Sequence, residues 1–287
     1  MYDADTEALL AKIAARPIAS GNGWSVADVV CSAGPADRPF EEQHGHVAIA
    51  IVTGGSFQYR GSGAGPGREL MTPGSLLLGN PGQCFECGHE HAQGDRCLSF
   101  QYAPAYFAAI TAGAGRGRRE RFASLRLPPV RELSPVVARA GAAMASSSPL
   151  APMAWEELAV QLAVRAVQVD AGRAPSRSPV SAAALARATR TVRYMDEHAG
   201  DALSLTDLAA QAGLSPFHFL RTFEDLTGAT PHQYVMRLRL RRAAARLLAE
   251  PAKILDVALD SGFGDVSNFN RAFRAEFGMS PRAYRHA

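Results

Sequence analysis

Five side chains of the types that bind soft metal ions lie within fourteen residues of the chain: Cys84, Cys87, His89, His91 and Cys97. Thiolates and imidazoles are the ligands that Zn²⁺ and other thiolate-preferring cations take in proteins. Thiols of lowered pKa would instead form a redox switch, and cysteine also fills small cores as a compact apolar side chain. Packing, a metal site and a thiol switch all stay open, because the sequence does not show which side chains converge.

His44 and His46 form a second candidate pair, which would bind an effector. Cys31 stands alone in the sequence and is expected in the core. We expect no catalytic residues and therefore no enzyme. The sequence requires no cofactor, and Zn²⁺ or another soft transition metal is the candidate if the cysteines and histidines converge.

These side chains lie in a region, about residues 24–110, that is typical of short antiparallel strands. The segment VAIAIVTGGSFQYRG predicts two strands about a hairpin turn at Thr53-Gly54-Gly55. In DRCLSFQYAP, small or polar residues alternate with Leu98, Phe100 and Tyr102, which is the period of a half-buried strand. Short strands separated by Gly/Pro turns predict a small antiparallel β-barrel or jelly roll.

The predicted organisation is an α+β chain of two domains. Residues 1–170 form a sensor and dimerisation domain, in which helices over about residues 120–170 follow the barrel. The stretch AGRAPSRSPVSAA is rich in Ala, Ser, Pro and Arg and marks a linker over residues 171–187. Residues 188–287 form an all-α domain, and a chain of 287 residues is long enough for both domains to have their own core.

The all-α region carries one pattern twice. The first copy contains Leu205, Leu208, Ala209, Gly213, Leu214, Phe219, Arg221, Phe223, Gly228, Pro231 and Tyr234, and the second contains Ile254, Val257, Ala258, Gly262, Phe263, Phe269, Arg271, Phe273, Gly278, Pro281 and Tyr284. The offset is 49 residues up to the glycine and 50 from Phe269 onward, so one residue is inserted between Gly262 and Phe269. Eleven positions that keep their chemical character indicate a duplicated unit.

Each copy predicts a short helix, a sharp turn and a longer helix. Gly213 and Gly262 make the turns, and Ser215 and Asp265 cap the longer helices. The buried stripes of these helices are Phe219, Phe223 and Leu226 and, in the second copy, Phe269, Phe273 and Phe277. A longer helix with arginine on its outer face is typical of a helix-turn-helix unit, which places that helix in a DNA major groove. The alternative, a helical hairpin with solvated arginines, is disfavoured by the second copy.

A third helix is predicted to connect the copies. Thr230 caps it, Pro231 begins it, and it continues to about Glu250. About twenty residues at ~1.5 Å each span about 30 Å, close to the ~34 Å of one turn of B-DNA. Two reading helices at its ends would therefore enter successive major grooves. Its basic residues are predicted to contact phosphates: Arg237, Arg239, Arg241 and Arg242.

The stretches SLTDLAAQAGLSPFHFLRTFEDLTGATPHQYV and ILDVALDSGFGDVSNFNRAFRAEFGMSPRAYR closely resemble the DNA-binding domain of AraC/XylS-type bacterial transcription regulators. The resemblance covers about residues 188–287 and is most specific in the second stretch. It implies a set of DNA-binding side chains on the two reading helices: Phe217, His218, Leu220, Arg221, Val266, Ser267, Asn268, Asn270 and Arg271. Leu220 departs from the polar residue that many members carry, and contact with a thymine methyl group is the physical substitute.

The resemblance also implies a cupin-like barrel and dimerising helices ahead of the DNA-binding domain. His44-x-His46 and the turn PGQ resemble cupin motifs, although the acidic ligand expected shortly after H-x-H is absent. The expected protein is an activator that binds double-stranded promoter DNA as a homodimer and contacts RNA polymerase. A small molecule, a metal or thiol oxidation would control it through the N-terminal domain. The alternatives are a metal-dependent cupin enzyme fused to a DNA-binding module and a constitutive DNA-binding dimer with a purely structural barrel.

The charge of the chain is modest for a DNA-binding protein. The net charge is +3, and residues 188–287 carry 13 Lys and Arg against 11 Asp and Glu, a balance of +2. DNA binding would therefore depend on a local stripe of arginine, not on a global field. No apolar run approaches about 18 residues, and the first residues lack the apolar segment of a signal peptide. We therefore expect a cytoplasmic protein without a membrane partner.

Overall fold

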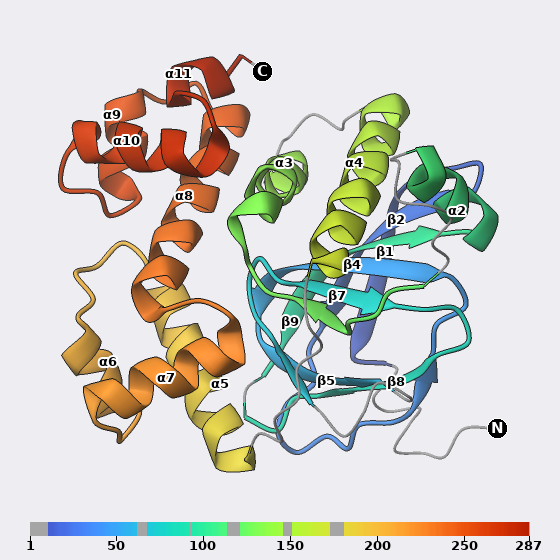
Figure 1. The fold of residues 1–287 in the computed structure, drawn as a ribbon, viewed down its shortest axis with the longest axis horizontal. Helices are drawn as coiled ribbons and strands as arrows, with labels where there is room; N and C mark the ends of the chain where they lie inside the picture. The colour runs from blue at the N-terminus through green and yellow to red at the C-terminus, as the bar shows by residue number, and fades with distance from the viewer. Residues whose placement is uncertain are drawn as a thin grey trace. The chain divides into compact units, whose positions relative to one another are not determined.

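The structure, a computed structural model, describes residues 11–61, 68–91, 93–113, 121–145, 151–172 and 181–286. Its contacts divide the chain into two units, residues 1–128 with 151–190 and residues 129–150 with 191–287. The first unit is built on two antiparallel sheets and the second is helical (Figure 1). The predicted combination of an antiparallel β-rich N-terminal region and an all-α C-terminal region is confirmed. None of the helices in these ranges has the length and apolar character needed to cross a lipid bilayer.

Within the described ranges, the first unit has one sheet of six strands and one of four. The larger sheet has the order β1-β2-β9-β4-β7-β10, with β1 (Ile13–Gly21), β2 (Trp24–Cys31), β4 (Val47–Gly55), β7 (Leu76–Gly79), β9 (Asp95–Tyr102) and β10 (Arg126–Leu127). The smaller sheet has the order β3-β8-β5-β6, with β3 (Glu42–Gln43), β5 (Phe57–Gly61), β6 (Glu69–Met71) and β8 (Cys84–Gly88). Strand β1 precedes the predicted start of the barrel at residue 24. Closure into a cupin-like barrel stays a prediction.

The hairpin predicted at Thr53-Gly54-Gly55 is wrong, because the strands on either side belong to different sheets. Strand β4 pairs with β7 and β9, whereas β5 pairs with β6 and β8. The two glycines lie inside β4, where the register against β9 shifts between Val52 and Gly54. Gly55 has a φ of +73°, and a Cβ there would lie 2.4 Å from the carbonyl oxygen of Gly94. The glycine pair therefore lets the chain bend from one sheet into the other.

Side chains of both sheets meet in one apolar cluster, which includes the fully buried Val52, Tyr59 and Met71. The opposite face of β9 carries Tyr102, whose Oη donates a hydrogen bond of 2.8 Å to the carbonyl oxygen of Ala159. Ala159 belongs to α4 (Pro152–Ala171), against which α2 (Pro104–Gly113) packs. Leu98, Phe100 and Tyr102 are buried as their alternation predicted, and Cys97 is buried as well.

The second unit contains one helix that precedes α4 in the sequence and the described helices from the end of α5 onward. They are α3 (Ser134–Ala145), which follows the 3-10 turn η1 (Arg131–Leu133), the end of α5 (Ala182–Glu197), α6 (Leu205–Gln211), α7 (Pro216–Thr227), α8 (Pro231–Ala249), α9 (Ile254–Asp260), α10 (Val266–Phe277) and α11 (Pro281–Tyr284). Helix α8 has almost the predicted bounds. Thr230 and Gln233 form a reciprocal capping box at its start.

Two helices depart from the domain boundaries that the sequence predicted. Helix α3, expected among the helices of the first domain, packs against α8 in the second unit. Its Ala138 shares an apolar cluster with Leu240 and Ala244, and small side chains of this kind allow close approach of two helices. Helix α5 begins at Ala182, inside the segment predicted as a linker. Residues 173–180 of that segment lie outside the described residues.

Candidate nucleic-acid interface

The first helix-turn-helix unit consists of α6 and α7, and local interactions fix its turn. The Ser204 side chain accepts a hydrogen bond from the Asp207 amide and caps α6. Gly213 then has a φ of +67°, a left-handed conformation that costs a residue with a Cβ about 1–2 kcal/mol. Ser215 caps α7 by accepting a hydrogen bond from the His218 amide. A glycine turn and two caps therefore set how α7 leaves α6, and the sequence predicted the glycine and the Ser215 cap.

The second helix-turn-helix unit, α9 and α10, repeats this design with one extra residue in its turn. Gly262 has a φ of +84°, and Asp265 caps α10 by accepting a hydrogen bond of 2.7 Å from the Asn268 amide. The extra residue is the exposed Gly264, which stands between the buried Phe263 and the cap. Helices α7 and α10 both have 12 residues, so the insertion changes the turn and leaves the reading helix intact.

The reading helices, α7 and α10, pack through the predicted phenylalanine stripes. Phe223 meets Tyr234 nearly edge to face, with ring centroids 5.7 Å apart, and Phe273 meets Tyr284 in the same way at 5.3 Å. Such pairs contribute about 0.5–1.5 kcal/mol beyond the burial of their area. The stripes Phe219, Phe223 and Leu226 and Phe269, Phe273 and Phe277 are buried throughout. Because these faces turn inward, the opposite faces must turn outward.

The outward faces carry all of the predicted DNA-binding side chains. Exposed on α7 are Phe217, at 75%, His218 and Arg221, and exposed on α10 are Ser267, Asn268 and Arg271. Leu220, Val266 and Asn270 are half-buried. All of them are at least partly accessible, and their contact with bases stays a prediction.

A hollow on α10 gathers the hydrogen-bonding groups of its outward face. It is lined by Ser267, Asn270, Arg271, Arg274 and Ala275. Arg271 Nη2 donates a hydrogen bond of 3.1 Å to Asn268 Oδ1, which holds the guanidinium against the helix. Arg274 was missing from the predicted set, although its place three residues after Arg271 put it on the same face. Guanidinium and amide groups are the side chains that read guanine and adenine in the major groove.

Two arginines of α8 are occupied inside the protein. Arg239 donates hydrogen bonds to the carbonyl oxygens of Ala199, Asp201 and Gly262. It thereby joins the segment that follows α5 to the turn of the second helix-turn-helix unit. Arg241 is 7% exposed, and burial lowers the pKa of its guanidinium. Three of the five N–H groups of Arg239 are used by these carbonyl oxygens and Arg241 is almost fully buried, so phosphate contact by either residue would require the loss of internal contacts and stays a prediction.

The other two arginines predicted to contact phosphates also have internal partners. Arg237 Nε lies 3.8 Å from a carboxylate oxygen of Glu276. Arg242 donates a hydrogen bond of 2.7 Å to Asp196 Oδ1, and its side chain is 47% exposed. Both would have to exchange an internal partner for a phosphate. Their phosphate contacts stay predictions.

The cysteine and histidine candidates of the first unit do not converge as one group. Cys87 packs against the apolar cluster between the sheets, and burial raises the pKa of its thiol. Cys84 begins β8 and pairs in register with Gln43 of β3. His91 lies beyond the end of β8, 3.9 Å from a carboxylate oxygen of Glu90. The predicted cluster of five ligands is therefore not present, because the side chains are distributed over β8, the turn that follows it and β9.

His89 and Cys97 instead lie beside a residue that the sequence did not connect with them. One ligand atom of His89 lies within 4.8 Å of one from Cys31 and one from Asp95. Burial lowers the pKa of His89, but hydrogen bonds with Asp95 and Cys31 outweigh this effect and raise it to about 9. Cys31, expected as an ordinary core residue, is partly buried in this group. No local signal in the sequence connects Cys31 with this group, because the pairing of β2 with β9 brings it there.

His44 and His46 are not brought to one site. His44 Nε2 lies 2.8 Å from Tyr59 Oη, and its ring stacks on Phe85 at a centroid distance of 4.1 Å. Gly79 makes room for it, because a Cβ there would lie 2.4 Å from His44 Nε2. Burial lowers the pKa of His44 to about 4, so its imidazole is neutral at pH 7. His46 is exposed, so the two histidines do not present a pair of ligands to one ion.

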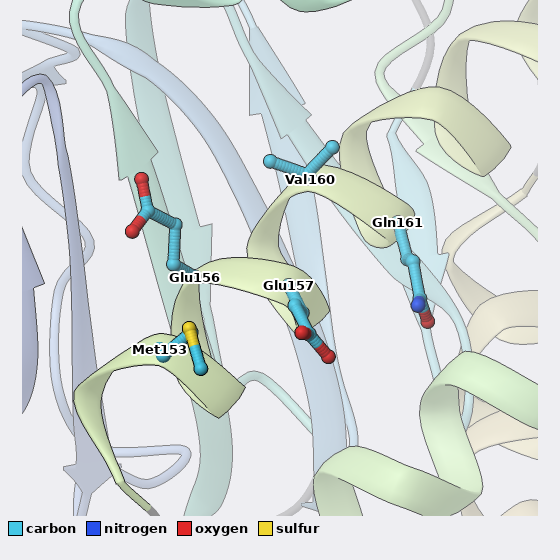
Figure 2. A pocket seen from close by; sticks show the side chains of 5 residues that line it. All are labelled: Met153, Glu156, Glu157, Val160 and Gln161. Atoms are coloured by element: carbon cyan, nitrogen blue, oxygen red, sulfur yellow. The ribbon is translucent and has the colours of Figure 1, made fainter.

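An open hollow also runs along the outer side of α4. Met153, Glu156, Glu157, Val160 and Gln161 line it (Figure 2). The side chains of Glu156 and Glu157 point in different directions in Figure 2. They do not form the converging pair of carboxylates that general acid–base chemistry uses.

Comparison with known sequence families finds a match over the helices described above. Residues 208–287 match a family profile described as a helix-turn-helix domain. The match begins inside α6 and includes both turns and both reading helices.

Curated relatives match about a third of the chain. The regulatory protein SoxS of Salmonella typhimurium is 34% identical over 95 residues, which are 33% of this chain and 89% of SoxS. The right origin-binding protein of Escherichia coli K12 is 36% identical over 94 residues, 33% of this chain and 32% of that protein. The transcriptional activator RhaS of Klebsiella pneumoniae is 34% identical over 100 residues, 35% of this chain and 36% of RhaS. The chain thus spans about a third of the length of the two longer relatives and most of SoxS.

Proposed function

Because the chain belongs to the AraC/XylS family of DNA-binding transcription regulators, we propose that it controls transcription by reading promoter DNA with α7 and α10. The observation that carries this proposal is the pair of helix-turn-helix units joined by α8. Figure 1 shows α7 and α10 near opposite ends of that helix. Its 19 residues span about 28 Å at ~1.5 Å per residue, close to one turn of B-DNA. Two reading helices at this spacing suit successive major grooves.

The two reading helices would recognise DNA by different contacts. On α10, Arg271 and Arg274 offer donors to guanine and phosphate, and Asn270 offers the amide pattern that matches adenine. On α7, Phe217 and Leu220 offer apolar surface for thymine methyl groups. Arg221 is the one strong donor among the predicted contacts of α7.

Selection from random double-stranded DNA, followed by footprinting of the selected sequence, tests the proposal. We expect one enriched site with two elements about 10–10.5 base pairs apart, protected on one face of the duplex. Replacing Arg271 with Ala should lower affinity for this site by about 1–3 kcal/mol and relax the base preference at one position.

Arg60→Ala is the matched control, because Arg60 is an exposed arginine on β5 in the other unit, away from the helices expected to dimerise. It should leave DNA affinity unchanged. A selection that enriches no sequence would refute sequence-specific reading. An equal loss on selected and random DNA in the Arg271 variant would identify a phosphate contact instead of a base contact.

Control by the N-terminal unit completes the proposal. A small molecule, a metal or thiol oxidation would change this unit and shift the population of DNA-binding states, which requires different effector affinities in the two states. The chain would act in the bacterial cytoplasm as a homodimer that contacts RNA polymerase. Activation is the favoured direction, in keeping with the name of the relative RhaS.

Transcription in vitro from a promoter that carries the selected site tests the direction of control. Added protein should raise the transcript yield of bacterial RNA polymerase, and a fall would indicate a repressor. One chain has a mass of 30.5 kDa, and sedimentation of the full chain should give twice that mass. A monomer at all concentrations would contradict the homodimer.

A further inference from the structure

A thiol, an imidazole and a carboxylate from three segments of the first unit lie together. One ligand atom from each of Cys31, His89 and Asp95 lies within 4.8 Å of the other two. Cys31 ends β2 and Asp95 begins β9, and the two residues are direct partners in the antiparallel register. His89 comes directly after β8, which belongs to the other sheet. Strand pairing thus brings Cys31 beside Asp95, 64 residues later in the sequence, whereas His89 precedes Asp95 by only six residues.

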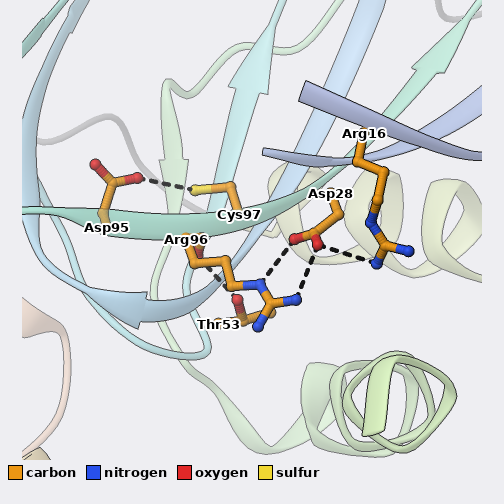
Figure 3. A network of polar contacts seen from close by, with 6 residues as sticks. All are labelled: Arg16, Asp28, Thr53, Asp95, Arg96 and Cys97. Carbon is orange, nitrogen blue, oxygen red and sulfur yellow. Dashed lines mark hydrogen bonds and ion pairs between the residues drawn. The ribbon is translucent and has the colours of Figure 1, made fainter. Parts of the chain in front are cut away.

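Cys97 adds a second sulfur to this group. Side chains alternate along a strand, so Asp95 and Cys97 point to the same side of β9 (Figure 3). Cys97 Sγ lies 3.6 Å from Asp95 Oδ1. Arg96, between them, points to the opposite side, where its Nε donates a hydrogen bond of 2.8 Å to Asp28. The strand therefore keeps a positive charge, which would repel a metal ion, away from the group.

The group is largely removed from water. The side chains of His89 and Asp95 are 5% and 8% exposed, and Cys97 is 7% exposed. Burying an imidazole and a carboxylate costs desolvation free energy that their mutual attraction only partly offsets. Because His89, with its pKa raised to about 9, is protonated at pH 7 and pairs with Asp95, a bound cation would displace that proton, take over the compensation of the carboxylate and use the freed lone pairs.

The backbone holds the group in place. Gly94, with a φ of +72°, precedes Asp95, and its amide donates a hydrogen bond of 2.8 Å to the carbonyl oxygen of Ala33. On the other side, Gly55 is the register partner of Asp95 in β4, and a Cβ there would lie 2.7 Å from Asp95 Cα. Asp95 is thus fixed between two strands, and a site on paired strands is more precise than one on loops.

We propose that four side chains form a site for one divalent cation that prefers thiolate ligands: Cys31, His89, Asp95 and Cys97. Zinc takes four ligands of these types at about 2.0–2.3 Å, which puts neighbouring ligand atoms about 3.3–3.8 Å apart. The ligand atoms of Cys31, His89 and Asp95 lie within 4.8 Å of one another, and Cys97 Sγ lies 3.6 Å from Asp95 Oδ1, so side-chain rotations that draw the four together would complete the site. Ca²⁺ and Mg²⁺ are disfavoured, because they prefer oxygen ligands throughout. The site would exist whether or not the chain binds DNA.

Zinc binding by the full chain tests this site. Elemental analysis after loading with Zn²⁺ should give one zinc per chain, and competition with a chromophoric chelator should give the affinity. His89→Asn should weaken zinc binding at least about 100-fold, because losing a ligand costs more than the 10–100-fold that follows loss of an outer-shell partner. Circular dichroism of each variant checks that it folds.

Cys84→Ser and His91→Asn are matched controls, since both residues lie in the same segment and outside the proposed site. They should bind zinc as tightly as the unaltered chain. The proposal is overturned if the full chain takes up no zinc, or if the control variants lose as much affinity as His89→Asn.

The spectrum of the Co²⁺-loaded chain tests the thiolate ligands without any substitution of the histidine. We expect a near-ultraviolet band for charge transfer from thiolate to cobalt, and Cys31→Ser should reduce its intensity by about half because one of two thiolates is lost. A bound cobalt without this band would overturn the proposal even if His89→Asn did not fold. A disulfide between Cys31 and Cys97 that forms with no metal uptake would also overturn it, and would indicate a redox switch.

Discussion

The two helix-turn-helix units share one frame but present different chemistry to solvent. In both, a glycine of positive φ makes the turn, a polar side chain caps the reading helix, and a phenylalanine packs on a tyrosine 11 residues later. The outward positions differ. The corresponding pairs on α7 and α10 are Phe217 and Ser267, His218 and Asn268, Leu220 and Asn270, and Glu224 and Arg274.

This difference teaches that folding and reading are separable in a duplicated motif. The buried positions stay alike because packing tolerates few changes of volume. The outward positions are free to diverge. Helix α10 has become a basic, hydrogen-bonding surface, whereas α7 is apolar at its start and carries Glu224, which would repel phosphates. We therefore expect α10 to supply most of the specific affinity for DNA.

Replacing the two turn glycines should give the largest difference in unfolding free energy between the two helix-turn-helix units. Gly213→Ala should cost about 1–2 kcal/mol, because only the left-handed φ is strained and nothing lies within 4 Å of the new Cβ. Gly262→Ala should cost about 2–4 kcal/mol, because the Cβ would also lie 2.8 Å from the carbonyl oxygen of Gly200 and crowd Arg239. Urea denaturation measures both. Equal losses would show that the two turns are equivalent.

The two arginines of the reading faces give the next contrast. Arg271→Ala should lower affinity for the selected site by about 1–3 kcal/mol, or about 5–150-fold. Arg221→Ala should cost less than about 1 kcal/mol, because Glu224 lies one helical turn away and already attracts its charge. Titration of both variants with the same labelled duplex compares them. A larger loss for Arg221→Ala would reverse the proposed order of the two helices.

Removal of the two helix caps should change the unfolding free energy by amounts that differ less. Asp265 accepts its hydrogen bond at 2.7 Å and carries a negative charge at the start of α10, whereas Ser215 accepts at 3.4 Å and is neutral. Asp265→Ala should therefore cost about 1–2 kcal/mol and Ser215→Ala about 0.5–1 kcal/mol of unfolding free energy. Thermal unfolding of both variants in low salt checks the order. Raising the salt concentration should narrow the gap, because it screens the charge of Asp265.

The smallest effect should come from making α7 resemble α10. Glu224→Arg should leave stability within about 0.5 kcal/mol, because the position is exposed. It should strengthen binding to random DNA and steepen the slope of log affinity against log salt by up to about 0.9, one added phosphate contact. Glu41→Arg, at an exposed position just before β3, is the control and should change neither the affinity for random DNA nor the salt slope. An unchanged slope for Glu224→Arg would place residue 224 away from the phosphates.

Local sequence patterns predict the helical unit of the chain well, because short-range contacts stabilise its helices and turns. Gly213, Ser215 and Asp265 act within three or four residues of themselves, so their spacing was enough to locate turns and caps. The stripe of Phe269 and Phe273 needed only the helical period. The α8 arginines were harder to predict. Whether Arg239 faces solvent or the end of α5 depends on how helices pack, and spacing along one helix does not show this.

In the first unit, sequence patterns predict strands but not which strands pair. Gly54 and Gly55 are typical of a hairpin turn, yet they mark a bend between sheets. Closeness in the sequence groups Cys84 and His91 with His89 and leaves out Cys31, which only the pairing of β2 with β9 brings near.

The order of residues alone was sufficient to specify the duplicated helices, their turns and their family, since hydrogen bonds and packing within about fifty residues produce them. The Cys31, His89 and Asp95 group and the buried arginines of α8 came from long-range folding. A side chain on a strand meets whatever the register places opposite it, and a shift of one residue would turn it to the other face of the sheet. Cys31 faces Asp95 across 64 residues of sequence because β2 pairs with β9.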